Sequence, residues 1–399
     1  MNFPFYIAKR YLISKKSHNA INIISWVSVL GIAIGTMALV IVLSASNGLQ
    51  NLIEDLYASF DPDLKITLVE GKTFDEKEIP KAEILALDEV VYYNQSLEEI
   101  ALIKYEDKQT VANIKGVEPI FYKMTGLDSM LISGNVSAEE SSLILGWGVS
   151  DKLSLFVTNG IPNQTQIIIP KRGTKKGLTP ESEFYRKYAN TTGVFSVSPD
   201  FDTKYALADL NFVQTLLKQK GQLSSVELGL AKNVNWDEVK SKIQTIVGNK
   251  YEVKTRYELN EIIFKTNETE KWITTLILTF ILIIASFNII GSLTMLIIDK
   301  KKDIWILKTM GANNKLIRKI FFAEGMLINF LGAFIGMFLG ALICWLQMQF
   351  SLLKLQGGVV EAYPVALQAL DFIYILAIVV FIGLIASWYP VRILTKKHL

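Results

Sequence analysis

The chain is poor in the two residue types that most often bind metal ions or cross-link small domains. Its 399 residues include one cysteine, Cys344, and two histidines, His18 and His398, near opposite ends. One cysteine excludes an intramolecular disulfide framework and any cysteine-based zinc site. Histidines so far apart in sequence argue against a histidine-dependent catalytic centre. We therefore predict no catalytic residue and no metal site.

Sequence motifs of hydrolases and nucleotide-binding proteins are also missing. The chain has no GxSxG, no HExxH and no complete phosphate-binding loop. Gly71-Lys72-Thr73 resembles the end of such a loop, but Ile66 stands where its first glycine would be. We interpret this segment as a turn after a strand. We expect no cofactor bound by this chain and no nucleic-acid partner.

Charge is missing from four long apolar runs, although the chain as a whole is 20% charged and 50% hydrophobic. A membrane-spanning helix needs about 20 mostly apolar residues. The qualifying runs are Ile21 to Leu43, Trp272 to Ile298, Gly325 to Met348 and Phe372 to Val391. The first run is longer than the apolar part of a secretory signal, which favours an uncleaved anchor over a cleaved signal peptide.

These runs divide the chain into alternating membrane and water-exposed parts. We predict a basic leader (1–20), a first membrane helix (21–43), a large domain with stalk helices (44–271), a second helix (272–298), a loop (299–321), a third helix (322–348), a loop (349–371), a fourth helix (372–391) and a tail (392–399).

Lysine and arginine are concentrated in three segments. A chain that crosses the membrane four times places all three on the same side of it. The leader, the loop from 299 to 319 and the tail carry net charges of +4, +5 and +3, whereas residues 51–270 carry about −8. Basic segments stay on the inner side of a membrane. We therefore expect both termini inside and the large domain outside.

The large insertion mixes strand-like and helix-like patterns, which predicts an α+β domain. An apolar stripe through Leu49, Leu56 and Phe60 extends the first helix as a stalk that ends at Asp61-Pro62-Asp63. Residues 257–271 form a second predicted stalk, and 210–217 and 236–247 two further helices. Predicted strands are 64–69, 90–93, 100–105, 111–117, 143–145, 166–169, 194–197, 226–230 and 251–255.

The loop after the second membrane helix contains a short predicted helix. Ile304, Leu307 and Met310 recur at helical spacing, Asp303 and Lys308 suit the helix dipole, and Gly311, followed by Ala312, suits a left-handed C-cap. Adhesion to anionic lipid headgroups is one interpretation of such a basic amphipathic helix. The other is a lever that a soluble partner pushes.

Several motifs together resemble permeases of the MacB and FtsX type among ATP-binding-cassette systems, in particular their lipoprotein-releasing branch, LolC and LolE. They are DIWILKTMGA at 303–312, Phe287-Asn288-Ile289-Ile290, Val42-Leu43-Ser44 with Asn47-Gly48, Ala8-Lys9-Arg10-Tyr11-Leu12, Ala386-Ser387-Trp388-Tyr389-Pro390 and, more weakly, Leu145-Gly146 and Ile169-Pro170.

The resemblance implies a fold of four transmembrane helices plus a large extracytoplasmic α+β domain of the MacB type on helical stalks. It also implies a permease subunit of the bacterial inner membrane, with a periplasmic domain and cytoplasmic termini. A separate LolD-like ATPase would bind ATP and Mg and push on residues 303–312. Other implied partners are a second permease copy or paralogue, membrane lipid, an acylated lipoprotein substrate and a LolA-like periplasmic carrier.

Further residues are candidates for helix packing, substrate contact and carrier docking. Gly31 and Gly35, and Gly332, Gly336 and Gly340, have the spacing of close helix packing, within the chain or between subunits. Candidate substrate-cavity residues are Asn22, Met37, Asn47, Phe287 and Asn288. A basic loop with Lys171, Arg172, Lys175 and Lys176 is either simply solvated or docks an acidic carrier. We expect Glu324 to face lipid headgroups or to pair with a lysine.

Three other functions stay open. The chain could instead be a related permease that exports a small molecule or peptide, or one that activates a cell-wall hydrolase. A membrane-anchored periplasmic enzyme lacks support from any catalytic motif. A receptor needs no inner coupling helix, so that helix separates it from a permease.

Overall fold

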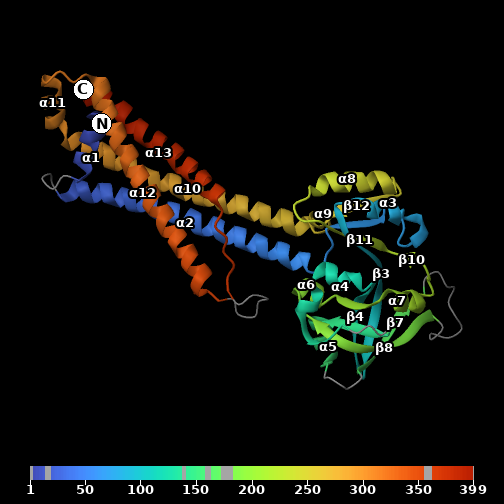
Figure 1. The fold of residues 1–399 in the computed structure, drawn as a ribbon. Helices are drawn as coiled ribbons and strands as arrows, with labels where there is room; N and C mark the ends of the chain where they lie inside the picture. The colour runs from blue at the N-terminus through green and yellow to red at the C-terminus, as the bar shows by residue number, and fades with distance from the viewer. Residues whose placement is uncertain are drawn as a thin grey trace. The chain divides into compact units, whose positions relative to one another are not determined.

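The computed structural model describes residues 3–13, 19–136, 141–157, 163–171, 183–354 and 362–398. The chain folds into two compact units (Figure 1). The helical unit comprises residues 1–52 and 263–399, and the second unit comprises residues 53–262.

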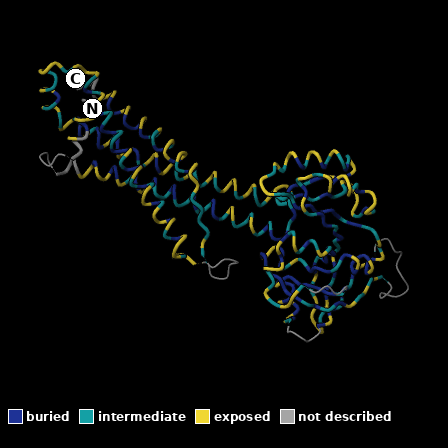
Figure 2. The backbone as a smooth tube through the Cα atoms, viewed as in Figure 1, coloured by how far each residue is buried: buried dark blue, intermediate teal, exposed yellow. Residues whose placement is uncertain are grey.

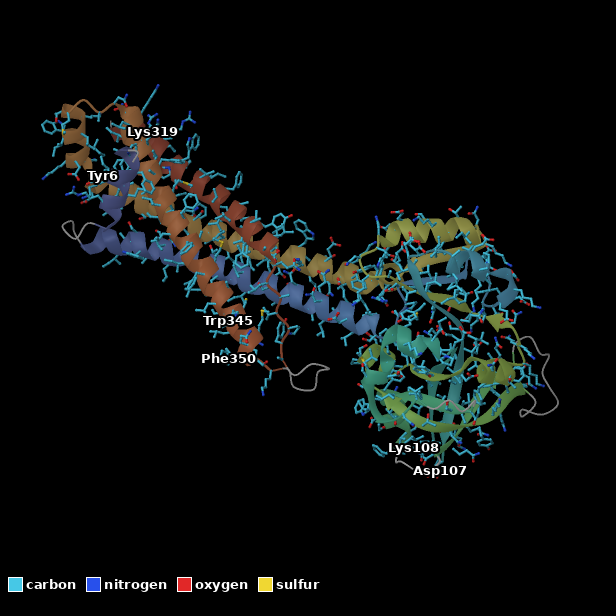
Figure 3. The ribbon with its side chains drawn as sticks, in the orientation of Figure 1. Tyr6, Asp107, Lys108, Lys319, Trp345 and Phe350 are labelled. Carbon is cyan, nitrogen blue, oxygen red and sulfur yellow. The ribbon has the colours of Figure 1, made fainter. Side chains whose placement is uncertain are left out.

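Four helices of the described chain are long and apolar enough to cross a membrane, as predicted. The helical unit is built mainly from six helices. They are α1 (Phe3–Ile13), α2 (Asn19–Ala58), α10 (Glu261–Asp299), α11 (Lys301–Thr309), α12 (Asn314–Phe350) and α13 (Ala369–His398). Within the helical unit, α11 and both chain termini lie at one end, which we call the α11 end (Figure 1). Lys319 marks this end of α12, and Trp345 and Phe350 mark the opposite end (Figure 3).

The predicted stalk helices agree only in part with the structure. α2 continues without a break from the membrane helix to Ala58, and so ends just before Phe60, the last residue of the predicted stripe. The second predicted stalk is interrupted at Asn260, which caps the end of α9 (Arg256–Leu259) before α10 begins at Glu261. A capping box formed by Thr255 and Glu258 starts α9 separately.

Glycines allow the membrane helices to pack closely within one chain. A Cβ atom on Gly336 would lie 2.4 Å from the carbonyl oxygen of Ala33, so α12 approaches the backbone of α2. Gly332 and Gly340 face α2 in the same way, whereas Gly31 and Gly35 of α2 face α10. Exposed positions recur along α10 (Figure 2). Among them are the apolar residues Trp272, Leu276 and Phe280.

The second unit is an α+β domain built on a ten-stranded mixed sheet. Its strands are β1 (Leu64–Leu68), β3 (Val90–Tyr105), β4 (Lys108–Val117), β5 (Leu131–Gly134), β6 (Ser142–Gly146), β7 (Asn163–Pro170), β8 (Phe184–Phe195), β9 (Tyr205–Asp209), β11 (Ser225–Leu230) and β12 (Tyr251–Thr255). A separate pair joins β2 (Phe74–Asp75) to β10 (Gln222–Leu223).

The strand order is β12-β1-β11-β3-β4-β9-β6-β8-β5, and β7 pairs with both β3 and β8. The strands β3, β4, β9, β6, β8 and β7 thereby close into a ring. The β4–β9 and β6–β8 pairs are parallel, and the others are antiparallel. The short helices around the sheet are η1 (Glu76–Glu78), α3 (Lys81–Leu85), α4 (Ile120–Thr125), η2 (Leu127–Met130), α5 (Trp147–Leu153), α6 (Pro199–Asp202), α7 (Leu210–Leu217) and α8 (Trp236–Val247).

The residues that follow α2 are fixed in the second unit by an aromatic and a charged contact. Phe60 is buried and stacks on Phe201, with ring centroids 4.4 Å apart. Asp63 forms an ion pair of 2.7 Å with Arg256, the first residue of α9. This contact ties the segments at the two ends of the second unit's chain to each other.

A buried ion pair lies beside Phe60. Lys115 Nζ is 2.8 Å from Glu227 Oε1, and their side chains are 2% and 0% exposed. The same ammonium lies 5.0 Å from the ring centroid of Phe60 and 4.5 Å from that of Phe121. Asn94 donates a 2.9 Å hydrogen bond to the second carboxylate oxygen of Glu227.

Candidate functional site

A cavity of about 280 Å³ opens in the helical unit between α2 and α10, toward the end opposite α11. One wall is mainly apolar and comes from α2, with Ile41, Val42, Ala45, Ser46, Leu49 and Gln50. The other wall is polar and comes from α10, with Asn267, Glu270, Lys271 and Thr274. Tyr363, which precedes α13, completes the lining. The cavity therefore offers an apolar and a polar surface side by side.

The polar wall contains a buried donor that lacks a partner. The amide nitrogen Nδ2 of Asn267 is buried and has no hydrogen-bond partner among the residues that the structure describes. A buried unpaired donor costs about 1–3 kcal/mol. An occupant with a carbonyl or phosphate oxygen would remove this cost.

Beside the cavity, a polar network joins three membrane helices. Asn47 of α2 is 1% exposed, and its amide nitrogen donates to a carboxylate oxygen of Asp371 on α13. Lys271 of α10 donates a 2.6 Å hydrogen bond to the amide oxygen of Asn47. Lys271 lines the cavity, and the network links its ammonium to Asp371 through the side chain of Asn47.

The connecting segment 362–368, between α12 and α13, packs directly on α2. The backbone N–H of Ala366 donates a 2.9 Å hydrogen bond to the carbonyl oxygen of Ser44. A Cβ atom on Gly48 would lie 2.5 Å from the backbone of Pro364, so only glycine fits there. Gln347 donates to the carbonyl oxygen of Tyr363 at 3.1 Å. These contacts hold the connecting segment against α2 between Ser44 and Gly48.

The structure brings one of the five predicted cavity residues to this site. Asn47 belongs to the network beside the cavity. Met37 is half-buried one turn before Ile41, whereas Phe287 is 61% exposed on α10. Asn288 is also exposed on α10, and it does not line the cavity. The side chain of Asn22 lies outside the described residues.

Sequence reasoning missed Asn267, Glu270, Lys271, Thr274 and Tyr363. A signal was present for the first four, because they recur at spacings of three and four and so share one helix face. No local pattern marks Tyr363, whose role depends on the packing of the connecting segment.

At the α11 end, the predicted short helix exists and is anchored by one residue. Ile304 is 7% exposed and packs with Leu296 and Ile297 of α10 and Phe321 of α12. Asp303 lies in the first turn and Lys308 in the last, and Gly311 has a φ of +94°. Ala312 packs partly against the same cluster.

The exposed side of α11 carries large apolar side chains in addition to Lys301 and Lys302. Trp305 and Met310 are 68% and 77% exposed, and Ile306 is exposed too, whereas Leu307 and Lys308 are half-buried. The three residues of the predicted stripe therefore do not share one environment. Ile304 is buried, Leu307 is half-buried and Met310 is exposed. Trp305, which the motif contains but the stripe omits, is the largest exposed side chain of α11.

The predicted carrier-docking loop is described only at its edge. Lys171 follows β7; its backbone N–H donates to the carbonyl oxygen of Glu183, and its ammonium lies 5.4 Å from the ring centroid of Tyr185. Arg172, Lys175 and Lys176 lie outside the described residues. Among the described residues, no group of three or more His, Cys, Asp or Glu side chains is placed to hold a metal ion.

Known proteins with similar sequences match this chain over most of its length. The chain is 26% identical to the lipoprotein-releasing system transmembrane protein LolE of Haemophilus influenzae, over 98% of this chain and 96% of the relative. It is also 26% identical to the corresponding LolC of Neisseria meningitidis, over 85% and 81%. The crystal structure of the periplasmic region of MacB from Actinobacillus actinomycetemcomitans aligns over 54% of this chain and 98% of that one, with 12% identity and a TM-score of 0.37.

Two family profiles cover most of the sequence. Residues 275–399 match the FtsX-like permease C-terminal family, and residues 25–246, more than half of the chain, match the MacB-like periplasmic core domain. The protein therefore belongs to the FtsX-like permeases that carry a MacB-like periplasmic core domain.

Proposed function

We propose that the chain is the permease subunit of an ATP-driven lipoprotein-releasing system in a bacterial inner membrane. It extracts acylated lipoproteins from the outer leaflet and passes them toward a periplasmic carrier. The two Lol relatives, similar over most of their length, support this assignment. The chain itself is a non-enzymatic subunit, and a separate ATPase binds ATP and Mg.

The observation that carries the proposal is the cavity between α2 and α10. Its apolar wall suits acyl chains, which gain about 0.8 kcal/mol per buried CH₂ group. Its polar wall, with the unpaired Asn267 amide, suits the carbonyl oxygens of an acylated amino terminus. An occupant that is apolar on one side and polar on the other matches a lipoprotein amino terminus better than a water-soluble molecule.

Filling the cavity tests this function. In Ala45→Trp the indole occupies the cavity, and lipoproteins should accumulate in the inner membrane of cells that depend on the variant. Thr269→Trp is the matched control, because Thr269 is exposed on α10 and does not line the cavity. Lipoprotein location is measured by membrane fractionation at equal permease levels. Normal release by Ala45→Trp would reject the cavity, and normal sorting after depletion of the permease would favour the functions of a related permease.

We further propose that α11 docks on the ATPase, with Trp305 and Met310 as contacts and Ile304 as the internal anchor. An exposed aromatic and methionine pair on a short anchored helix is the kind of surface that a protein partner buries. Trp305→Asp should abolish co-purification of the ATPase. Phe350→Asp, which also introduces an acid at an exposed aromatic residue but at the other end of α12, should not (Figure 3). Retention of the ATPase by Trp305→Asp would reject the docking role.

The orientation follows from the charges and from the position of the termini. Both termini and α11 share one end of the helical unit, and all three segments are basic. We propose that this end faces the cytoplasm, that residues 53–262 are periplasmic, and that a second permease copy or paralogue completes the complex.

A further inference from the structure

Two charged side chains of the membrane helices differ in their access to a ligand. Glu324 in α12 is 0% exposed, and neither carboxylate oxygen has a hydrogen-bond partner among the described residues. The expectation that Glu324 faces lipid headgroups or pairs with a lysine is therefore wrong. Lys271 in α10, in contrast, lines the cavity of about 280 Å³ between α2 and α10. Of the two, Lys271 is the one that an occupant can contact.

The polar wall of the cavity has hydrogen-bond donors available for an occupant. A lysine ammonium carries three N–H donors. The contacts of the described residues use one of them, the 2.6 Å hydrogen bond from Lys271 to the amide oxygen of Asn47. One turn earlier on the same face of α10, the buried amide nitrogen of Asn267 has no partner among those residues. Together the two side chains offer one charged and one neutral donor, which suits an anionic oxygen.

The Lys271 ammonium is held by a neutral group. The amide oxygen of Asn47 accepts from the ammonium, and the amide nitrogen of Asn47 donates to the carboxylate of Asp371. The amide therefore stands between the two charges. The carboxylate in the cavity lining belongs to Glu270, which is exposed. An anionic occupant would give Lys271 the charged partner that the amide of Asn47 does not supply.

α2 and α10 lie antiparallel along the cavity. Ser25 of α2 shares a 3.1 Å hydrogen bond with Ser292 of α10, and further along α2 Asn47 bonds to Lys271. Residues late in α2 therefore lie beside residues early in α10. The polar wall of α10 thus lies level with the last residues of the α2 wall, and the first residues of the α2 wall lie deeper in the bundle.

The two parts of the cavity correspond to different depths of the membrane. Ile41 belongs to the uncharged run 21–43, which is long enough to cross the hydrocarbon core. Lys271 immediately precedes the uncharged run that begins at Trp272, and Trp272 is 69% exposed. Exposed tryptophans collect at the level of the lipid headgroups. Trp345 of α12 is a second exposed tryptophan at this end of the helical unit (Figure 3). The donors of α10 are thus at headgroup depth, and the apolar wall is at acyl-chain depth.

We propose that the cavity binds a glycerophospholipid of the membrane, with its phosphate on Lys271 and Asn267 and the first part of one acyl chain along Ile41, Val42 and Leu49. A glycerophospholipid has an anionic phosphate and acyl chains at these two depths. The acylated amino terminus of a lipoprotein shares the acyl chains but has no phosphate. The phospholipid occupies the cavity between transport cycles, and an incoming lipoprotein displaces it; this displacement rests on the proposed function.

Native mass spectrometry of the delipidated full chain in mild detergent tests the binding. The probes are dioleoyl phosphatidylglycerol, dioleoylglycerol, which has the same chains without the phosphate, and inorganic phosphate. The phospholipid should form a one-to-one adduct. Dioleoylglycerol should bind about tenfold more weakly, and inorganic phosphate should form no adduct at the same concentration. Lys271→Met and Asn267→Leu should each weaken the phospholipid adduct about tenfold, because each removes a donor to a charged oxygen.

Three further variants separate the cavity from general contact with lipid. Lys271→Arg keeps the charge and should keep the adduct. Ala45→Trp fills the cavity from the apolar wall, leaves both donors in place, and should lose the adduct. Lys265→Met removes an exposed lysine of α10 that does not line the cavity, and it should leave the affinity unchanged.

Equal affinity for the phospholipid and dioleoylglycerol, or equal affinities of Lys271→Met and Lys265→Met, would overturn the proposal. Inorganic phosphate that binds as tightly as the phospholipid would overturn it too, because the site would then recognise a free anion. The measurement needs neither ATPase nor lipoprotein. Its failure is therefore distinguishable from failure of the proposed function, which is decided by lipoprotein location and ATPase co-purification.

Discussion

Replacing Lys115 by methionine should destabilise the second unit more than any surface substitution. Lys115 and Glu227 form a pair with side chains that are 2% and 0% exposed, so the substitution leaves a carboxylate buried without its main partner. Breaking such a pair costs about 3–5 kcal/mol. Lys65 stays 3.8 Å from the same oxygen and Asn94 still donates to the other, which favours the lower value, about 3 kcal/mol.

The aromatic contacts of Lys115 add to this cost. Its ammonium lies over the rings of Phe60 and Phe121, and desolvated cation–π contacts contribute up to about 2 kcal/mol each. A methionine sulfur recovers up to about 1.5 kcal/mol against each ring, which leaves a net loss of about 0.5 kcal/mol per ring, or about 1 kcal/mol for the two rings. The total of about 4 kcal/mol corresponds to a fall in Tm of roughly 8–16 °C for a unit of this size.

Pulse proteolysis of the full chain in detergent, along a temperature series, measures unfolding of residues 53–262. Lys204→Met is the control, because Lys204 pairs with Asp200 on the surface, where both side chains are about 60% exposed. The control should lose less than about 0.5 kcal/mol. Adding Glu227→Gln to Lys115→Met should restore part of the stability. If Lys115→Met costs no more than the control, the buried pair does not stabilise this unit and the reasoning fails.

Three further predictions concern pH, packing and topology. Burial alone would raise the pKa of Glu98, but Lys65 and Lys115 outweigh it and lower the pKa from 4.5 to about 2. The resulting stabilisation, about 3 kcal/mol, is present above pH 4.5 and is lost as the pH falls toward 2; Glu98→Gln should remove this dependence in acid pulse proteolysis. Gly336→Leu should separate α12 from α2 and lower the yield of monodisperse protein. Gly31→Ala should not, because the nearest atom to the added Cβ lies 3.6 Å away. Equal yields of the two variants would contradict the close packing. In a Cys344→Ser background, Phe350→Cys should react with an impermeant maleimide in intact spheroplasts and Thr309→Cys only after permeabilisation; the reverse pattern inverts the topology.

Local patterns predicted the elements whose signals are local. The helices at 210–217 and 236–247 have their predicted bounds, because an apolar period coincides with an N-cap, Asp209 in one and Asn235 in the other. β3 was predicted as two strands, since polar Asn94 and Ser96 interrupt its apolar pattern. Their partners, Glu227 and Ser225, lie far along the chain, and no local pattern can supply them.

The site residues, like the secondary structure, could be predicted only where the signal lies in neighbouring residues of the sequence. The exposed apolar residues of α11 are readable in the motif 303–312, and Asn47 belongs to a motif that resembles the permease family. Tyr363 and Glu324 were missed or misplaced, because the first depends on a segment folding back onto α2 and the second on how three helices meet.

The contact between the connecting segment and α2 sets an order of assembly during synthesis. The carbonyl oxygen of Ser44 receives its hydrogen bond from Ala366, so more than 300 residues are made between donor and acceptor. At about 5–20 residues per second, α2 waits roughly 15–60 s for this partner. Even after α10 has been made, the cavity lacks Tyr363 and the network lacks Asp371 until the end of that interval. A ribosome that stalls before residue 363 therefore leaves a membrane-inserted chain whose cavity is still open, which makes completed translation itself the step that finishes the site.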